Sequence, residues 1–268
     1  MYAIGGLLVV TAVSIGGSTA AGRLIDHVDR LILSERPGAA LQFVNIPEPL
    51  LTLAAAELQS SLADLRTRPW TEAGLCEQMA RRLATSPWIE SLHSVRRTGD
   101  GRFEIRANYR VPVAAVQRAS EFFLVDVQGV RLPGVYAFNA QWKVIRGVSA
   151  APPAAASLWI GEDIKAGLKL LQLLTDEPYS GQLGGIDLDN FEGRSDPRGS
   201  HVELLTDRVG GRIRWGSAPG RELEENSITQ KINLLRRNFA DTGRADADHL
   251  VIDISTFPDR YSIPRELG

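Results

Sequence analysis

The stretch SPWIESLHSVRRTGDGRFEIRANYRVPVA, residues 86–114, decides how the first part of the body folds. Its residues TGDG, at 98–101, are typical of the loop that closes a β-hairpin. After this loop, apolar and polar side chains alternate, which predicts a strand with one buried and one solvated face. The apolar positions are Phe103, Ile105, Ala107 and Tyr109. Pro112 has no amide proton to donate to a sheet, so the strand is expected to end before it.

The residues that precede this hairpin predict one strand and two helices. Residues 41–46, LQFVNI, favour a short strand, and the Ala- and Leu-rich residues 50–65 favour a helix. A second helix is expected to begin after Thr71 as N-cap and to end at Pro87, with Trp88 covering its end. The residues expected on its buried face are Leu75, Met79 and Leu83, with Cys76 beside them as a small core residue. The predicted order is strand, helix, helix, strand, strand.

The remaining residues predict a second mixed body. The expected elements are a hairpin around 126–129, an extended loop at 149–157, a helix at 161–174, a strand at 184–190, two paired strands at 200–206 and 211–216, a helix at 227–239 and a strand at 249–255. Ser227 and Gln230 form a capping box at the start of the second helix. Its buried stripe is expected to be Ile228, Ile232, Leu235 and Phe239. Residues 259–264 either extend the last strand or add an edge to it.

Residues 2–22 contain no charged side chain and match the ~20 apolar residues that cross a bilayer as one helix. We expect a membrane anchor there, and its apolar residues include Leu7, Leu8, Val9, Val10, Val13 and Ile15. A signal peptide is the main alternative, because STA before Ala21 resembles a cleavage site, although no basic residue precedes the run. A buried segment of a soluble core is the third interpretation. Residues 23–38 have helical spacing and end at a turn signal, which predicts a juxtamembrane linker.

Composition and charge argue against several classes of protein. Lys and Arg number 30 and Asp and Glu number 32, so the net charge of −2 gives no basic surface for nucleic acid. The single cysteine, Cys76, excludes an intrachain disulfide and a multi-cysteine zinc site. Apolar residues make up 44% of the chain, which is typical of a globular protein.

No sequence pattern of an enzyme or metal site is present. Neither a G-x-S-x-G elbow nor a phosphate-binding loop occurs. Residues 187–193, DLDNFEG, begin like a calcium loop, but the glycine falls one place late and no glutamate completes the spacing. The four histidines stand far apart in the sequence. We therefore predict no catalytic residue, no cofactor, no metal and no small-molecule substrate, while a Ser/His/Asp set assembled only in space stays open.

Taken in order, these segments resemble the FtsQ/DivIB family of bacterial cell-division proteins. The stretch at 86–114 is similar to the end of that family's POTRA domain, where Pro-Trp, an Arg-bearing strand, a turn and a second strand lead to Pro-Val-Ala. FLVDVQGVRLPG, at 123–134, is similar to the segment that follows POTRA. GEDIKAGLKLLQLL, GIDLDN, VELLTDRVGGRIRWG, KINLLRRNF and VIDIS then follow in the family's order. Residues 47–70 are longer than the usual first POTRA helix, and 255–264 depart from the usual final strand.

The resemblance implies an α+β chain that acts without catalysis. It implies a transmembrane anchor at 1–22, a juxtamembrane linker at 23–38, a POTRA domain (β-α-α-β-β) at 39–114 and a mixed α/β, FtsQ-type β-domain at 115–268. Such a protein spans the inner (cytoplasmic) membrane once, with its body in the periplasm or extracytoplasmic space at the division site, the septum. It serves as a divisome scaffold that binds membrane proteins of the FtsB/FtsL type.

In this family the partner adds a strand to the C-terminal edge of the β-domain, the mode called β-augmentation. Carried over to this sequence, the contact residues are Ser255, Thr256, Phe257, Arg260, Tyr261 and Ser262, with Lys231 and Leu235 on the preceding helix. The alternative for these residues is structural: Phe257 and Tyr261 close the core, and Lys231 is a solvated charge on a helix.

Two other functions fit the predicted architecture. A POTRA-containing secretion or outer-membrane assembly factor would bind client peptides with little selectivity. A membrane-anchored envelope hydrolase would need a cleft in which ionisable groups converge and their pKa values are perturbed.

Overall fold

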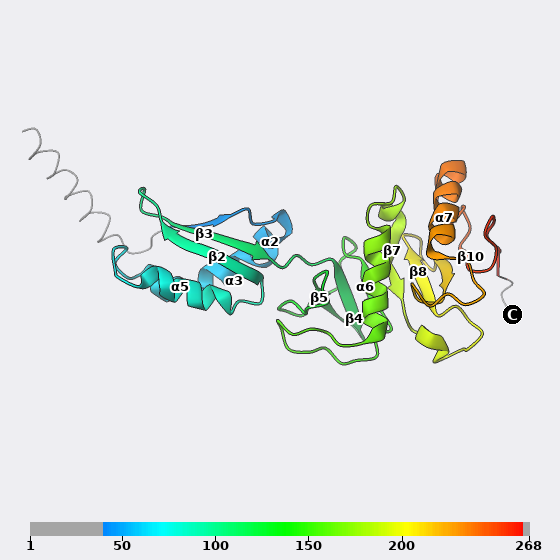
Figure 1. Cartoon of the computed structure of the whole chain (residues 1–268), viewed down its shortest axis with the longest axis horizontal. Helices are drawn as coiled ribbons and strands as arrows, with labels where there is room; N and C mark the ends of the chain where they lie inside the picture. Colours follow the sequence, from blue (N-terminus) through cyan, green and yellow to red (C-terminus); the bar gives the residue numbers. More distant parts are fainter. Residues whose placement is uncertain (1–39, 265–268) are drawn as a thin grey trace, which may run out of the picture. The chain divides into compact units, whose positions relative to one another are not determined.

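Residues 40–264 are described by the structure, a computed structural model of the chain, and they divide into two compact units. One unit ends at Tyr109 and the other begins at Arg110 (Figure 1). The described residues contain two β-sheets and six α-helices, so the predicted α+β class is confirmed. The predicted domain boundary, after Ala114, lies later in the sequence than this division. Ala114 already belongs to β4 of the second sheet.

The predicted membrane anchor at 2–22 and the predicted linker at 23–38 lie outside the described residues. Within residues 40–264, no helix has both the length and the apolar character needed to span a membrane. The longest of these helices has 15 residues, fewer than the ~20 that a bilayer requires.

The first unit is a three-stranded sheet with helices packed against it (Figure 1). Its elements are β1 (Leu41–Val44), α2 (Glu48–Leu53), α3 (Ala55–Ser61), α4 (Ala63–Arg66), α5 (Leu75–Ala84), β2 (Ile89–Arg97) and β3 (Phe103–Tyr109). The last strand is central, since β3 pairs in parallel with β1 and antiparallel with β2. The hairpin predicted around TGDG is confirmed: the Thr98 amide donates to the Arg102 carbonyl at 3.0 Å, and Gly101 has a φ of 81°.

The single helix predicted over 50–65 is instead three short helices, α2 to α4. The backbone leaves the helical region at Ala54 and Leu62, although neither proline nor glycine occurs there. Five residues of this segment are buried, namely Leu50, Ala54, Leu58, Leu62 and Leu65. Side chains spaced four apart drift by about 40° per step around a helix of 3.6 residues per turn. From Leu50 to Leu62 this drift sums to about 120°, and Leu65, three residues further on, turns back by about 60°. All five side chains therefore fall on one side of the segment, where they are buried.

The second predicted helix, α5, begins later than expected. Its N-cap is Gly74 rather than Thr71, with a left-handed φ of 76° that glycine adopts without a steric penalty. Leu75, Met79 and Leu83 are fully buried as predicted. The prediction that Cys76 is a core residue is wrong, since its side chain is only half-buried.

Trp88 lies between α5 and β2 and connects the helices to the sheet. Its ring is buried, and its indole Nε1–H donates to Glu57 Oε2 on α3 at 2.8 Å. Because this bond joins residues far apart in the sequence, it also fixes where α3 lies.

Trp88→Phe is therefore expected to lower the free energy of unfolding of the first unit by about 1–2 kcal/mol, through the lost hydrogen bond and part of the ring. Glu57→Gln is the matched control, because the amide oxygen still accepts from the indole and little change is expected. Chemical denaturation measures both variants. Equal stability of Trp88→Phe and the parent protein would show that the Trp88–Glu57 bond contributes nothing.

The second unit is built on a seven-stranded mixed sheet in the order β10-β9-β8-β7-β6-β4-β5. Its elements are β4 (Ala114–Arg118), β5 (Glu121–Val125), β6 (Val144–Arg146), α6 (Glu162–Leu174), β7 (Leu183–Asp187), β8 (Val202–Thr206), β9 (Arg212–Gly216), α7 (Ile228–Thr242) and β10 (Val251–Asp253), with 3-10 turns at Ser180–Gln182 and Phe191–Gly193. The sequence pattern predicted neither β4 nor β6. The predicted antiparallel pairing of β8 with β9 is confirmed.

Both long helices of this unit are crossover connections. Helix α6 joins the parallel neighbours β6 and β7, and α7 joins the parallel neighbours β9 and β10. Parallel strands cannot be joined by a tight turn, so a helix returns the chain across the sheet each time. The capping box predicted for α7 is present, since the Ser227 hydroxyl accepts from the Gln230 amide and Gln230 accepts from the Ser227 amide.

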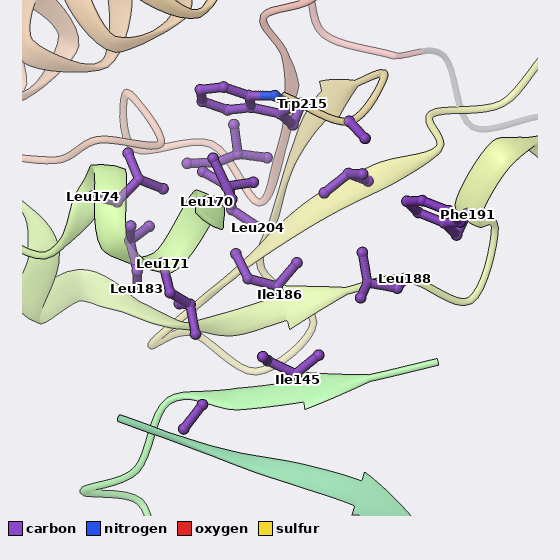
Figure 2. Packing of buried hydrophobic residues seen from close by; sticks show 14 of the residues in the cluster. Ile145, Leu170, Leu171, Leu174, Leu183, Ile186, Leu188, Phe191, Leu204 and Trp215 are labelled. Atoms are coloured by element: carbon purple, nitrogen blue, oxygen red, sulfur yellow. The ribbon is translucent and has the colours of Figure 1, made fainter. Parts of the chain in front are cut away.

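The apolar core of the second unit lies between the sheet and these helices (Figure 2). Figure 2 shows strand residues Ile145, Ile186, Leu204 and Trp215 beside Leu170, Leu171 and Leu174 of α6. Strand side chains alternate between faces, so the neighbours of these residues project from the other face. These neighbours include the charged residues Arg146, Asp187, Glu203 and Arg214, and Arg212, which precedes the core residue Ile213, projects from the same face.

Candidate partner-binding edge

The C-terminal edge of the seven-stranded sheet consists of β10 and one further extended residue, Ser262. The Asp253 amide donates to the Ser262 carbonyl and the Ser262 amide donates to the Asp253 carbonyl, both at 2.8 Å. The prediction that residues 259–264 add an edge is thus confirmed at Ser262. Residues on either side of such a pair direct their main-chain groups away from the partner strand. In an extended chain, the amides and carbonyls of Tyr261 and Ile263 would therefore point toward the outside of the sheet.

The turn that leads from β10 to this edge is held by a buried asparagine. Asn226 Nδ2 donates to the Ile254 carbonyl at 2.8 Å and to the Phe257 carbonyl at 2.6 Å. Its own amide donates to the Ser255 carbonyl at 2.7 Å. The Asp253 carboxylate accepts from both the amide and the hydroxyl of Ser255. The edge is therefore preorganised rather than a loose C-terminal tail.

Side chains around the edge differ in exposure. Thr256, Phe257 and Arg260 are exposed, and the Arg260 guanidinium lies 4.7 Å from the centre of the Phe257 ring. Tyr261 is half-buried against the core, with its hydroxyl 3.2 Å from His249 Nε2. Ser255 and Ser262 are also half-buried. The structure thus brings together the six predicted contact residues of the segment 255–262 and leaves three of them exposed.

The two helical contact residues in the prediction, Lys231 and Leu235, are placed elsewhere. Neither has exposed surface, so neither is accessible to a partner that docks on the described residues, and this part of the prediction is wrong. The fully buried positions of α7 are Lys231, Leu234, Leu235 and Asn238. Of the predicted stripe, Ile228, Ile232 and Phe239 are only half-buried. The face that enters the core is thus rotated toward Lys231, which is not a solvated helix charge.

Lys231 is accommodated in the core by a carboxylate and an aromatic ring. Its Nζ donates to Glu225 Oε2 at 2.9 Å and lies 5.2 Å from the centre of the Trp215 ring. Glu225 also accepts from the amide and hydroxyl of Ser217. Burial opposes ionisation of Glu225, but the bonds from Ser217 and Lys231 outweigh it and hold the pKa of the carboxyl below its usual value of 4.5. The pair fixes the segment that carries Asn226.

Sequence reasoning did not select Asn226 or Glu225. Both precede the N-cap Ser227, and an acidic residue there was attributable to the helix dipole alone. Their partners, Ile254, Phe257 and Ser217, are set by the tertiary fold. No signal in the local sequence distinguishes them from ordinary residues of a helix start.

Two acidic residues of the segment 187–193, which begins like a calcium loop, form ion pairs with arginines. Asp187 pairs with Arg146 and with Arg212, the latter at 3.2 Å, and Asp189 Oδ2 lies 3.8 Å from Arg146 Nε. Within residues 40–264, no cluster of three or more His, Cys, Asp or Glu side chains is placed to hold a metal ion. No protein-family model and no curated protein matches the sequence.

Proposed function

We propose that this protein is a non-catalytic, membrane-anchored division-site scaffold of the FtsQ/DivIB type, which binds its partner through the C-terminal sheet edge. The observation that carries the proposal is the edge itself. It is pinned from within by the Asp253–Ser262 pair and by Asn226. The alternation of an extended chain would turn the main-chain groups of Tyr261 and Ile263 outward. A strand that is rigid and still open on one side is suited to main-chain pairing with an added chain.

The order of elements supports the family part of the proposal. The first unit runs strand, helices, strand, strand, as expected of a POTRA domain, with the short α2 to α4 in place of one longer helix. The second unit follows with a mixed sheet whose last strand lies at one edge, as expected of the β-domain. The membrane anchor at 2–22 and its position in the inner membrane belong to the same proposal.

Main-chain pairing accounts for affinity, and the exposed side chains of the edge account for selectivity. Each outward amide and carbonyl of Tyr261 and Ile263 would meet a complementary group of the added strand. Phe257 and Arg260 form a flat apolar and cationic surface beside it. Such a surface suits an FtsB/FtsL-type membrane protein with an extended segment next to its own membrane helix.

A fluorescent fusion of the full chain is expected to concentrate at the division plane, since a divisome scaffold is recruited there. The measurement is the ratio of signal at the division plane to signal along the lateral envelope, in cells at matched stages of division. A fusion that lacks residues 1–22 is the control and is expected to lose this enrichment along with membrane attachment. Uniform envelope labelling of the full-length fusion would contradict the proposal and would favour the secretion or assembly alternative.

A further inference from the structure

The face of the seven-stranded sheet that lies opposite α6 and α7 carries a polar groove with no role in the edge pairing. The groove has a volume of about 570 Å³ and runs over β6, β7, β8 and β9. Arg146, Asp187, Glu203, Arg212 and Arg214 form its floor. It falls within the size range of ligand sites, but those are mostly apolar, so a small apolar ligand is not its natural occupant.

One wall of this groove is a long, ordered connection. Strands β7 and β8 are antiparallel neighbours, and a turn of about 2–5 residues is enough to join such a pair. Residues 188–201 join them instead. Asn190 organises this loop, since its side chain donates to the carbonyls of Asp196 and Ser200 and accepts from the amides of Ser195 and Asp196. The loop therefore has a built conformation, and it places Arg198 at the rim of the groove.

Charges in the groove are arranged in layers. The floor carboxylates lie underneath, with side-chain exposures of 6% for Asp187 and 18% for Glu203. The guanidiniums lie above them, with exposures of 31% for Arg146, 39% for Arg212 and 40% for Arg214.

The rim adds charges of both signs. Arg198 is exposed, and within residues 40–264 its guanidinium forms no ion pair. Asp189 and Asp196 are exposed on the loop side, where Asp196 Oδ1 accepts from the Arg198 amide. Over the whole groove, four arginines are balanced by four carboxylates, and the three sheet arginines each pair with at least one of them. The charges are nevertheless separated: exposed carboxylates lie on the loop side, whereas the exposed charges over the sheet are guanidiniums. The sheet side therefore favours a ligand with negative charges.

The strand register sets the spacing of the arginines, and thereby the spacing that negative charges on a ligand would need. Arg146, Asp187, Glu203 and Arg214 lie directly opposite one another on four adjacent strands. Adjacent strands are about 4.8 Å apart, so Arg146 and Arg214 are separated by about 14 Å across the sheet. An extended polypeptide advances about 3.3 Å per residue, so residues i and i+4 project on one face about 13 Å apart. Arg212 is within reach of a residue between them.

We infer that this groove binds an extended acidic segment of a partner polypeptide, with carboxylates at positions i and i+4 that pair with Arg146 and Arg214. The segment crosses the strands and does not add to them. A second hollow of about 460 Å³ continues from Arg212 and Arg214 to Leu250, Val251 and Ile263. An apolar residue beyond the second carboxylate fits this end. The contacts with Arg146 and Arg214 need no main-chain pairing at the edge, so they can be tested separately from the proposed function. Only this far end, at Val251 and Ile263, is shared with the edge.

The test uses the full-length chain in non-ionic detergent and a fluorescent peptide in which glutamate alternates with serine. The control peptide has glutamine in place of each glutamate. We expect saturable binding of the glutamate peptide that weakens as salt is raised, and no saturable binding of the glutamine peptide. Arg214→Gln is expected to weaken binding about tenfold, because it removes a charge-assisted contact. Arg198→Gln is expected to weaken it less, because it removes only a positive charge at the rim. Arg198 forms no ion pair in the described residues, so its replacement leaves the fold intact.

Arg237→Gln is the matched control, because Arg237 is an exposed arginine of α7 on the opposite face. Its binding is expected to equal that of the parent protein. The inference is overturned if the glutamate peptide does not bind, or if Arg198→Gln, Arg214→Gln and Arg237→Gln weaken it equally. It is also overturned if polyphosphate or anionic lipid vesicles compete at far lower charge concentration than the peptide, since the groove would then be a general anion surface.

Discussion

Glu225→Ala is expected to lower the free energy of unfolding of the second unit by about 3–5 kcal/mol, the usual cost of removing one partner from a buried ion pair. Lys231 has no exposed surface, so its ammonium group would remain in the core without a counter-charge. The Ser217 amide and hydroxyl would lose their acceptor at the same time. Urea denaturation followed by tryptophan fluorescence measures the change, because Trp215 lies against Lys231.

A double variant separates the charge from the packing. Lys231→Met combined with Glu225→Gln removes both charges, keeps an acceptor for Ser217 and fills a similar volume, so much of the lost stability is expected to return. The single variants Lys231→Met and Glu225→Gln, together with this double variant and the parent protein, form a cycle that isolates the interaction between the two residues. A loss of less than about 1 kcal/mol in Glu225→Ala would show that the pair is no more than a solvated surface contact.

The same pair predicts how stability depends on pH. The pKa of Glu225 in the folded chain lies below its usual value of 4.5, so its ionisation stabilises the fold above that pH. This contribution is lost as the pH falls below 4.5 and passes through the lower pKa of the folded state. The stability difference between the parent protein and Glu225→Gln is therefore expected to be constant near neutral pH and to shrink in acid. A difference that grows in acid would contradict the assignment.

The elements that local patterns encode were predicted well. The TGDG hairpin, the capping box at Ser227 and the pairing of β8 with β9 depend on turn chemistry and on residues close in sequence. Lys231 was not predicted to be buried, because the local sequence of a lysine on a helix indicates a solvated charge. Its burial depends on contacts with Glu225 and Trp215, which only the tertiary structure shows. The stripe on α7 was misjudged for the same reason: Lys231 and Asn238 belong to the core through their partners, not through their hydropathy.

The two surfaces considered for binding differ in how much of each the sequence can predict. The edge at 255–262 is one continuous segment, so a family resemblance could point to it. The groove combines Arg146, Asp187, Glu203 and Arg214 from four strands, and only the register places them in a row. Asn226, which holds the edge in place, lies on the far side of α7 in the sequence. The role of Asn226 can be recognised only when its hydrogen-bond partners in the folded chain are known.

Ile263→Pro is expected to reduce recovery of an FtsB-type partner at least about tenfold in co-purification from membranes, a loss of about 1.4 kcal/mol or more. Proline removes the outward amide at position 263, and its ring occupies the space of an incoming carbonyl. The side chain of Ile263 is largely exposed, and in an extended chain its amide points away from β10, so we expect the intrachain sheet to be unaffected. Ser262 is already extended, which is the conformation that a residue before proline requires.

Ile263→Ala is the control that decides between main-chain and side-chain recognition. It keeps the amide and removes most of the apolar side chain, so partner recovery is expected to fall by no more than about threefold. If alanine and proline reduce recovery equally, the partner contacts the Ile263 side chain and does not extend the sheet. If neither reduces recovery while both variants keep the thermal midpoint of the parent protein, the partner binds elsewhere. Full recovery in Ile263→Pro would then remove the edge from the proposed function, whatever the fluorescent fusion shows about localisation.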